Sequence, residues 1–253
     1  DLKDADALNG VFEHGPDHVF HFAANPDIAR ATTEPSIDFW EGTYLTQNVL
    51  EAMRRTSTTR LTYASGSGVY GDRSHLLPNE DFGPLVPVST YGASKLGCES
   101  LIAAYCHMFG FTAAAFRFAN VVGDGQTHGV TYDFVRRLRS DPETLEILGD
   151  GTQDKSYVHV DDIVRAMFIA TPDPGSGFRV FNVGTGDSVT VRRIADLVTE
   201  EMGLTGVEYV FTGGPRGWRG DVPVVHFDDS RIRALGWKPL YSSEEAIRSS
   251  IRH

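Results

Sequence analysis

The chain has 253 residues, of which 41% are apolar, and a formal charge of −11 at pH 7. This length and composition allow one sizeable hydrophobic core, or one core with a smaller lobe. The acidic balance argues against nucleic acids and anionic membranes as partners. No run approaches the ~18 apolar residues of a membrane span, and the first residues lack the basic and apolar parts of a signal peptide. We therefore expect a cytoplasmic protein.

Two strands, a helix and a turn are predicted in residues 1–71. Residues 18–23 are a short apolar run followed by small residues, as in a buried parallel strand that ends near a ligand. Residues 35–55 have the spacing of a helix, residues 60–65 form a second strand, and the glycine-rich residues 66–71 form a turn. The apolar side chains that recur at helical spacing are Phe39, Leu45, Val49 and Leu50.

The next predicted helix places a phenol and an ammonium on one face. Ser89 and Thr90 are capping candidates for a helix that runs to Phe109. Tyr91 and Lys95 are four residues apart, and positions i and i+4 share a helix face. A phenol with a pKa near 10 is no base at neutral pH, whereas a cation held close favours the phenolate and lowers that pKa. We expect a proton-transfer pair; an exposed pair with a packed tyrosine and a solvated lysine is the alternative.

Both cysteines fall on this same predicted helix. Cys98 and Cys106 are eight residues apart, which is about 12 Å along a helix axis. A disulfide needs Cα atoms within ~7 Å of each other. We therefore expect both thiols to be reduced and buried.

The elements after residue 111 change character along the chain. Residues 112–118 form a strand, and Asn120 lies in the loop after it, where open parallel sheets bind their ligands; an ordinary turn residue is the alternative for Asn120. Residues 132–139 then form a helix and residues 145–148 a strand, which suggests a second lobe. The remaining predicted elements are a strand at 178–183 that returns to the main sheet, a helix at 191–202 and a final helix near Ser243.

Eight short motifs are distributed through the chain in a fixed order. They are His21-Phe22-Ala23-Ala24, Asn48 to Ala52, Val69-Tyr70-Gly71, Tyr91 to Lys95, Arg117 to Asn120, Tyr157 to Asp162, Asn182 to Gly184 and Leu235 to Pro239. In this order they resemble the extended short-chain dehydrogenase/reductase family, and within it the NAD-dependent epimerases and dehydratases, most of all the UDP-sugar 4-epimerases. The resemblance implies an α/β fold, with a Rossmann-like doubly wound parallel sheet and a smaller α+β substrate-binding lobe.

The resemblance also implies how the chain is divided. Residues 1–123 and 176–189 would belong to the dinucleotide-binding Rossmann domain, and residues 124–175 and 190–253 to the nucleotide-sugar-binding lobe. A complete relative opens with a strand, a Gly-x-x-Gly-x-x-Gly turn and a helix that receives the pyrophosphate, whereas this sequence starts at a point about sixty residues into a relative. We expect the N-terminal strands to be missing because the sequence is part of a longer protein; a natural short relative that cannot bind dinucleotide is the alternative.

NAD is the cofactor that the resemblance implies, and no metal is expected. Asp1 and Leu2 match a pair that touches adenine in relatives, and Lys95 matches the lysine that hydrogen-bonds the nicotinamide ribose. The full set of implied cofactor contacts is Asp1, Leu2, Phe22, Ala23, Ala24, Tyr91, Lys95 and Phe118.

The loop before Val69 decides which reaction the resemblance implies. Family members oxidise a nucleotide sugar at C4, and 4,6-dehydratases carry Asp-Glu just before this valine to catalyse elimination. Ser67 and Gly68 stand there in this chain, so elimination is not expected. What remains is 4-epimerisation, in which hydride passes to NAD, the 4-keto sugar rotates and hydride returns to the other face. Tyr91 would take the C4 hydroxyl proton while Lys95 lowers its pKa.

Two glycines stand where relatives carry polar side chains. Gly66 replaces the hydroxyl residue that hydrogen-bonds the substrate, and the flexible turn lets either Ser65 or Ser67 present its hydroxyl instead. We favour Ser67; a water or Thr90 is the alternative. Gly42 replaces an asparagine that is frequent in relatives, and the sequence offers no physical account of that change.

Cationic and polar residues elsewhere are expected to bind the nucleotide sugar. Lys155 matches an Arg or Lys of relatives, and Arg216 or Arg219 lies in a segment that often supplies an arginine to the diphosphate. His128 lies in a loop that faces the sugar in relatives, whereas His159 is expected to be structural. The full set of implied substrate contacts is Gly66, Ser67, Tyr91, Asn120, His128, Lys155, Arg216 and Arg219.

The resemblance therefore predicts an NAD-dependent isomerase that interconverts UDP-glucose and UDP-galactose, or UDP-glucuronate and UDP-galacturonate. The loop at residues 125–128 offers no arginine to a uronate carboxylate, but the sequence does not separate these substrates. Another nucleotide-sugar reductase or dehydratase, and a non-catalytic nucleotide-sugar-binding fragment, are the alternatives. A homodimer through the helices at 36–55 and 88–109 is expected, as in dimeric relatives.

Overall fold

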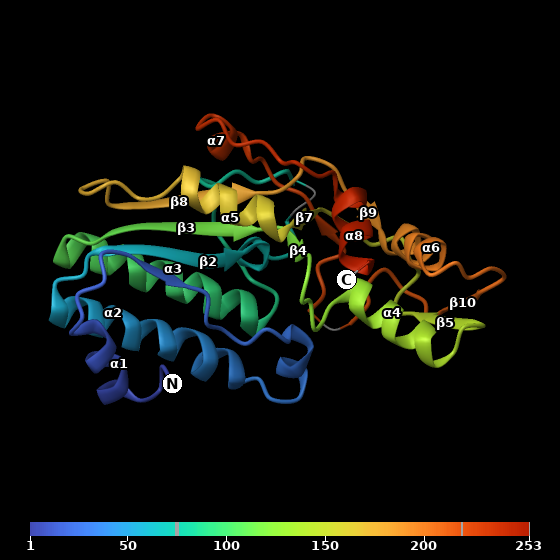
Figure 1. The fold of residues 1–253 in the computed structure, drawn as a ribbon, viewed down its shortest axis with the longest axis horizontal. Coiled ribbons are helices and arrows are strands. Elements are labelled where there is room, and N and C mark those ends of the chain that lie inside the picture. The colour runs from blue at the N-terminus through green and yellow to red at the C-terminus, as the bar shows by residue number, and fades with distance from the viewer. Residues whose placement is uncertain (74–75, 219, 253) are drawn as a thin grey trace. The chain divides into compact units, whose positions relative to one another are not determined.

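A computed structural model describes residues 1–73, 76–218 and 220–252, and the chain forms two compact units (Figure 1). Unit 1 consists of Asp1–Gly71, Gly83–Arg117 and Met167–Phe181. Unit 2 consists of Asp72–Phe82, Phe118–Ala166 and Asn182–His253. The division into domains made from the sequence uses other boundaries and stays a prediction.

The main sheet has the strand order β1-β2-β3-β8. β1 (Val19–His21) is shorter than the predicted strand and pairs in parallel with β2 (Arg60–Gly66). β3 (Thr112–Phe118) is buried at every position, as expected of a strand that is covered on both faces. β8 (Phe178–Val183) returns to this sheet as predicted. The predicted α/β fold with a parallel sheet is confirmed.

Three helices of unit 1 lie on one side of this sheet (Figure 1). They are α1 (Ala5–Phe12), α2 (Tyr44–Thr56) and α3 (Thr90–Phe109). The α3 helix has the predicted extent, because the Ser89 hydroxyl accepts a hydrogen bond from the Gly92 amide and Gly110 ends the helix with a left-handed φ of 70°. Cys98 and Cys106 are free and buried, as predicted.

The helix expected at residues 35–55 contains an irregular first part. A π-helical turn, η2 (Phe39–Thr43), precedes α2. The extra residue of such a turn rotates the preceding side chains by about 100° relative to a regular helix. As a result Phe39, which recurs at helical spacing with Leu45 and Val49, is 50% exposed while those two side chains are buried. Asp38 is buried in its place, with 1% of its surface exposed.

Unit 2 combines short sheets with helices. The loop expected after residue 118 contains a strand, β4 (Asn120–Val122), which pairs in parallel with β7 (Tyr157–His159). The helix expected at 132–139 and the strand expected at 145–148 are confirmed as α4 and β5. The strands are β4 (Asn120–Val122), β5 (Thr144–Ile147), β6 (Asp154–Lys155), β7 (Tyr157–His159), β9 (Val189–Thr190), β10 (Glu208–Phe211) and β11 (Val224–Val225). The helices are α4 (Val130–Ser140), α6 (Val191–Glu201), α7 (Ser230–Arg233) and α8 (Ser243–Ile251), and α5 (Val160–Ile169) ends in unit 1.

Helix length and polarity bear on membrane association. Within the described residues, no helix combines the length and the apolar surface needed to pass through a lipid bilayer.

Candidate active site

Tyr91 and Lys95 meet beside the C-terminal end of β2, as their spacing on α3 predicts. Lys95 is 5% exposed, and its Nζ donates a hydrogen bond of 2.6 Å to the carbonyl oxygen of Ala64. The same Nζ lies 5.1 Å from the ring centroid of Tyr63 and 5.5 Å from that of Tyr91. No protein partner of the Tyr91 hydroxyl is found among the described residues. The pair therefore presents an unpaired phenol next to a buried ammonium.

The two pKa values shift in opposite directions. Burial, reinforced by the carboxylate of Asp38 and by Cys98, raises the pKa of Tyr91 to about 12. Burial lowers the pKa of Lys95 to about 8, although Cys98, Glu99 and Asp38 act in the opposite direction. The expectation that Lys95 lowers the pKa of Tyr91 is therefore wrong for this arrangement. Its ammonium lies beside the phenol ring, and desolvation is the largest cause of the raised pKa of Tyr91.

A close backbone approach brings the turn after β2 against α3. This turn is the 3-10 helix η3 (Ser67–Tyr70). A side chain at Gly92 would collide with the carbonyl oxygen of Gly68, so only glycine allows this approach. The approach sets Gly66 opposite the phenol, because a Cβ atom on Gly66 would lie 3.9 Å from the hydroxyl oxygen of Tyr91. A hydroxyl residue at position 66 would thus reach the reacting end of Tyr91.

Relatives carry a substrate-binding hydroxyl at the position of Gly66, and the hydroxyls proposed to replace it differ in their hydrogen-bond partners. Ser65 is buried and its hydroxyl donates to Glu99 Oε1 over 2.5 Å. The Thr90 hydroxyl donates to Asp38 Oδ2 over 2.6 Å. Neither is free to bind a substrate, which argues against Ser65 as a catalytic residue and against Thr90 as its substitute. Within the described chain the Ser67 hydroxyl has no protein partner, so Ser67 stays the preferred candidate.

Residues predicted to contact NAD line one apolar cavity of unit 1. Leu2, Phe22 and Ala23 belong to the wall of this cavity, which has a volume of about 350 Å³. Asn48 of α2, which belongs to one of the family motifs but was not predicted as a site residue, donates a 2.9 Å hydrogen bond to the Leu2 carbonyl oxygen. Lys95 has three N–H donors and one acceptor, Ala64, among the described residues. The apolar wall and the spare donors fit a ring and a ribose hydroxyl.

Three further predicted cofactor positions lie outside that cavity wall. Asp1 is exposed, and its carboxylate accepts a hydrogen bond from the Lys3 amide. Ala24 is half-buried after β1, and Phe118 is buried as the last residue of β3. Their roles toward NAD stay predictions.

The cations predicted to bind a diphosphate already have carboxylate partners in unit 2. Lys155 Nζ lies 2.6 Å from Asp221 Oδ1. Arg216 pairs with Asp72 and also donates to the backbone oxygen of Asp221. Arg219 lies outside the described residues. A diphosphate at these cations would have to displace carboxylates.

The other predicted residues of unit 2 occupy different settings. Asn120 lies in β4 and its amide donates to the Ser156 carbonyl oxygen over 3.1 Å, so part of its hydrogen-bonding capacity serves the fold. His128 is exposed in the loop before α4. His159 is buried, and its Nδ1 accepts a hydrogen bond from the Asp161 amide, which supports the structural role expected of it.

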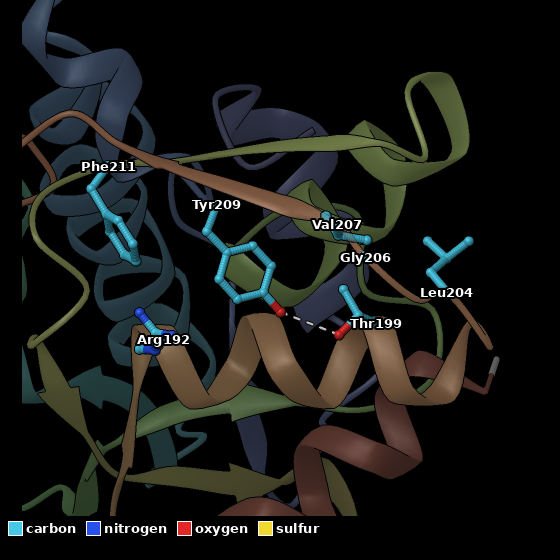
Figure 2. Close-up of a pocket in the computed structure, with 7 residues that line it drawn as sticks. All are labelled: Arg192, Thr199, Leu204, Gly206, Val207, Tyr209 and Phe211. Carbon is cyan, nitrogen blue, oxygen red and sulfur yellow. Dashed lines mark hydrogen bonds between the residues drawn. The ribbon is translucent and has the colours of Figure 1, made fainter.

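A second cavity lies between α6 and β10, and Figure 2 shows its lining. Its volume is about 410 Å³, and none of the predicted site residues lines it. The guanidinium of Arg192 lies 5.9 Å from the ring centroid of Tyr209 and 5.8 Å from that of Phe211. The Tyr209 hydroxyl is bonded to Thr199 and Asp196. Across the described parts of the chain, no group of His, Cys, Asp and Glu side chains is arranged to hold a metal ion.

Comparison with known proteins decides the family. Residues 1–184 match the model of the NAD dependent epimerase/dehydratase family. The chain belongs to this family. It is 30% identical over 257 residues to the UDP-glucose 4-epimerase of Mycolicibacterium smegmatis, a match that covers 99% of this chain and 80% of that protein.

Solved structures agree with this assignment. A crystal structure of UDP-galactose 4-epimerase has a TM-score of 0.87 and 38% identity over 99% of this chain and 80% of that chain. The UDP-glucose 4-epimerase of Thermus thermophilus in complex with NAD has a TM-score of 0.87 and 30% identity over 100% of this chain and 82% of that chain. The resemblance, the Rossmann-like fold, the isomerase class and NAD as cofactor are thereby confirmed.

The burial of Lys95 predicts how stability depends on pH. Its pKa is about 8 in the folded chain and ~10.4 in the unfolded chain. Between these values the unfolded chain binds more protons at this site, so folding is favoured as pH rises. We expect the free energy of unfolding of the wild type, minus that of Lys95→Met, to rise by up to about 1 kcal/mol per pH unit between pH 8 and 10.

Urea unfolding of both proteins at several pH values measures this difference. The matched control is Lys238→Met, which removes an exposed ammonium. The buried Lys95 would not be the cause if the difference in unfolding free energy between wild type and Lys95→Met stayed constant with pH, or if the difference for the control variant rose equally.

Proposed function

We propose that this protein is a UDP-sugar 4-epimerase and that UDP-glucose and UDP-galactose are its substrates. The observation that carries the proposal is the unpaired phenol of Tyr91 next to the buried ammonium of Lys95, beside a turn that has no carboxylate. A proton acceptor without an acid–base pair for elimination suits reversible oxidation at C4. NAD supplies the hydride acceptor and donor when it is bound.

Each residue of unit 1 has an assigned task. Tyr91 takes the proton of the C4 hydroxyl and returns it after the sugar has turned. Lys95 holds a ribose hydroxyl of the cofactor with its spare donors. Ser67 donates a hydrogen bond to the C4 oxygen. Leu2 and Phe22 provide apolar contacts to the cofactor.

Residues of unit 2 are assigned to the nucleotide end and to the sugar. Lys155 and Arg216 bind the diphosphate after releasing their carboxylate partners. Asn120 and His128 are assigned to the sugar. The loop at residues 124–129 contains no arginine or lysine for a uronate carboxylate, and this favours a neutral hexose.

Tyr91→Phe tests the catalytic assignment in the full-length protein. The variant should lose more than nine-tenths of its turnover of UDP-galactose and keep its affinity for the sugar nucleotide, because the change removes a proton acceptor and almost no volume. Coupled assays measure turnover, and calorimetry measures binding. Assays with UDP-glucuronate decide the substrate: faster turnover of the uronate than of UDP-galactose would overturn the choice of a neutral hexose.

Ser67→Ala and Gly66→Ser test the replacement hydroxyl. Ser67→Ala should cost ~1–3 kcal/mol, or about 5- to 150-fold in kcat, because the C4 oxygen loses a donor. A serine fits at position 66, since its Cβ would contact only Tyr91 at 3.9 and 4.0 Å and the backbone φ is extended at −163°. Ser100→Ala on the exposed side of α3 is the control. The role of Ser67 as the donor to the C4 oxygen would be refuted if Ser67→Ala left kcat unchanged and Gly66→Ser raised kcat several-fold.

The homodimer remains part of the proposal. Phe39 and Trp40 before α2 are each 50% exposed, and Met108 at the end of α3 is 67% exposed. Apolar surface of this kind marks interfaces, and a two-fold axis would bury both copies of it. Sedimentation at micromolar concentration should give a dimer, and Trp40→Glu should shift it toward the monomer. The same change at exposed Leu240 of unit 2 is the control, and a monomeric wild type would contradict the proposal.

A further inference from the structure

Asp38 is a buried carboxylate that no motif of the chain singles out. It is 1% exposed and stands directly before the π-helical turn η2. Within the described chain it has no cation within ion-pair distance, and its partners are the neutral donors of Asn25 and Thr90, at 2.9 and 2.6 Å. A buried charge without a counter-ion costs several kcal/mol. An Asn in this place could accept from Asn25 with its Oδ1 and donate to the Thr90 hydroxyl with its Nδ2, so a neutral side chain would also have partners and the charge calls for a reason other than folding.

The contacts of Asp38 converge on the two residues that precede Tyr91 and Lys95. The Thr90 hydroxyl binds its carboxylate, and the Ser94 hydroxyl donates to its backbone oxygen over 2.7 Å. Thr90 and Ser94 are one turn apart, so Asp38 is bonded to α3 at two points of its first turns. Fixing that turn fixes the direction in which the phenol and the ammonium leave the helix.

Gly42 and Thr43 make the second of these contacts possible. A side chain at position 42 would overlap the Ser94 hydroxyl, so glycine leaves the space in which Ser94 reaches Asp38. Thr43 Oγ1 lies 2.9 Å from Ser94 Oγ and completes its hydrogen bonds. The glycine that the sequence left unexplained therefore belongs to the contact between η2 and α3.

Asn25 fixes the carboxylate from the other side. Its Oδ1 accepts from the Asp27 amide, and its Nδ2 donates to the Asp27 carbonyl oxygen and to Asp38. These three bonds leave one orientation of the amide, in which its NH2 group is shared between the Asp27 carbonyl oxygen and the Asp38 carboxylate. Asp38 is thus held in place and cannot turn away from α3.

We propose that Asp38 is a positioning residue of the Tyr91–Lys95 pair, which holds the first turns of α3 through Thr90 and Ser94 and stabilises the Lys95 ammonium with its negative charge. This inference rests on the proposed epimerase function. Its electrostatic part has support in the effect of Asp38 on both groups, since it raises the pKa of Tyr91 and of Lys95. The titratable groups that act on or face the Lys95 ammonium are Asp38, His21 of β1, Tyr63 of β2, and Tyr91, Cys98 and Glu99 of α3.

Asp38→Asn tests the charge while it keeps the shape. Loss of the negative charge lowers the pKa of Lys95 and of Tyr91, so both limbs of the kcat profile against pH should move to lower pH by ~0.5 unit or more. A role in stability alone would lower kcat or stability and leave both limbs in place, which would overturn the proposal. Asp17→Asn, which removes an exposed carboxylate of unit 1, is the control and should leave the limbs unmoved.

Thr90→Val and Thr90→Ser test the hydrogen bond by which Asp38 holds α3. Both variants can be studied even if Asp38→Asn does not fold. Valine keeps the shape of threonine and loses the hydrogen bond to Asp38, so kcat should fall at least several-fold with little change in KM. Serine keeps the hydroxyl and should restore most of the loss. Equal kcat values for the two variants would overturn the positioning role.

A titration that needs no turnover separates this inference from the proposed function. ¹³C NMR of the lysine side chains, with Lys95→Met to assign the signal, gives the pKa of Lys95 in the wild type and in Asp38→Asn. A downward shift in the variant supports the proposal even if the wild type fails to turn over UDP-galactose, which would refute the epimerase function alone. An unchanged Lys95 titration overturns the inference whether or not the enzyme is active.

Discussion

The arrangement of the candidate site depends on the burial of the Lys95 ammonium. A lysine in the interior needs polar contacts, and here a carbonyl oxygen of β2 and the faces of two tyrosine rings provide them. To bring Nζ to Ala64, the first turns of α3 must lie against the end of β2. Gly92 allows this approach, and Ser65 and Glu99 bond the strand to the helix. One buried charge thus sets the distance between the strand, the turn and the helix.

Local patterns predicted the elements that carry the site. The α3 helix follows from its cap at Ser89 and its end at Gly110, and β3 from a run of small and apolar residues, since these signals lie within the segments themselves. The π-helical turn could not be predicted in this way. The Asp38 carbonyl oxygen directly before it is bonded to the Ser94 hydroxyl, which is distant in sequence. Because the turn changes which side chains face inward, the burial of Asp38 and the exposure of Phe39 were missed together.

The chemistry of the site was predicted to a similar extent. The spacing of Tyr91 and Lys95 was enough to show that their side chains meet, because helix geometry is regular. The sign of the pKa shift of Tyr91 was not predictable, since both the desolvation of the phenol and its repulsion by the Asp38 charge depend on residues from other segments. The same reason explains Ser65. Its place beside Gly66 suggested a catalytic hydroxyl. In the structure this hydroxyl instead donates to Glu99, which is paired with Arg117 in the core.

The cations of unit 2 bear on how the proposed diphosphate site would work in an acidic protein. Lys155 and Arg216 were identified because they match positions and segments that supply cations in relatives, but no local pattern indicated that Asp221 and Asp72 would neutralise them. With these partners present, a bound diphosphate would replace a carboxylate at each cation. The free energy gained at each cation is then the difference between two ion pairs, which is smaller than the energy of one new ion pair. The released Asp221 carboxylate, 5% exposed in this structure, must then be hydrated or find new donors. A count of positive charges therefore overstates what these two cations contribute to nucleotide affinity. Other contacts of the nucleotide have to supply the larger part of it.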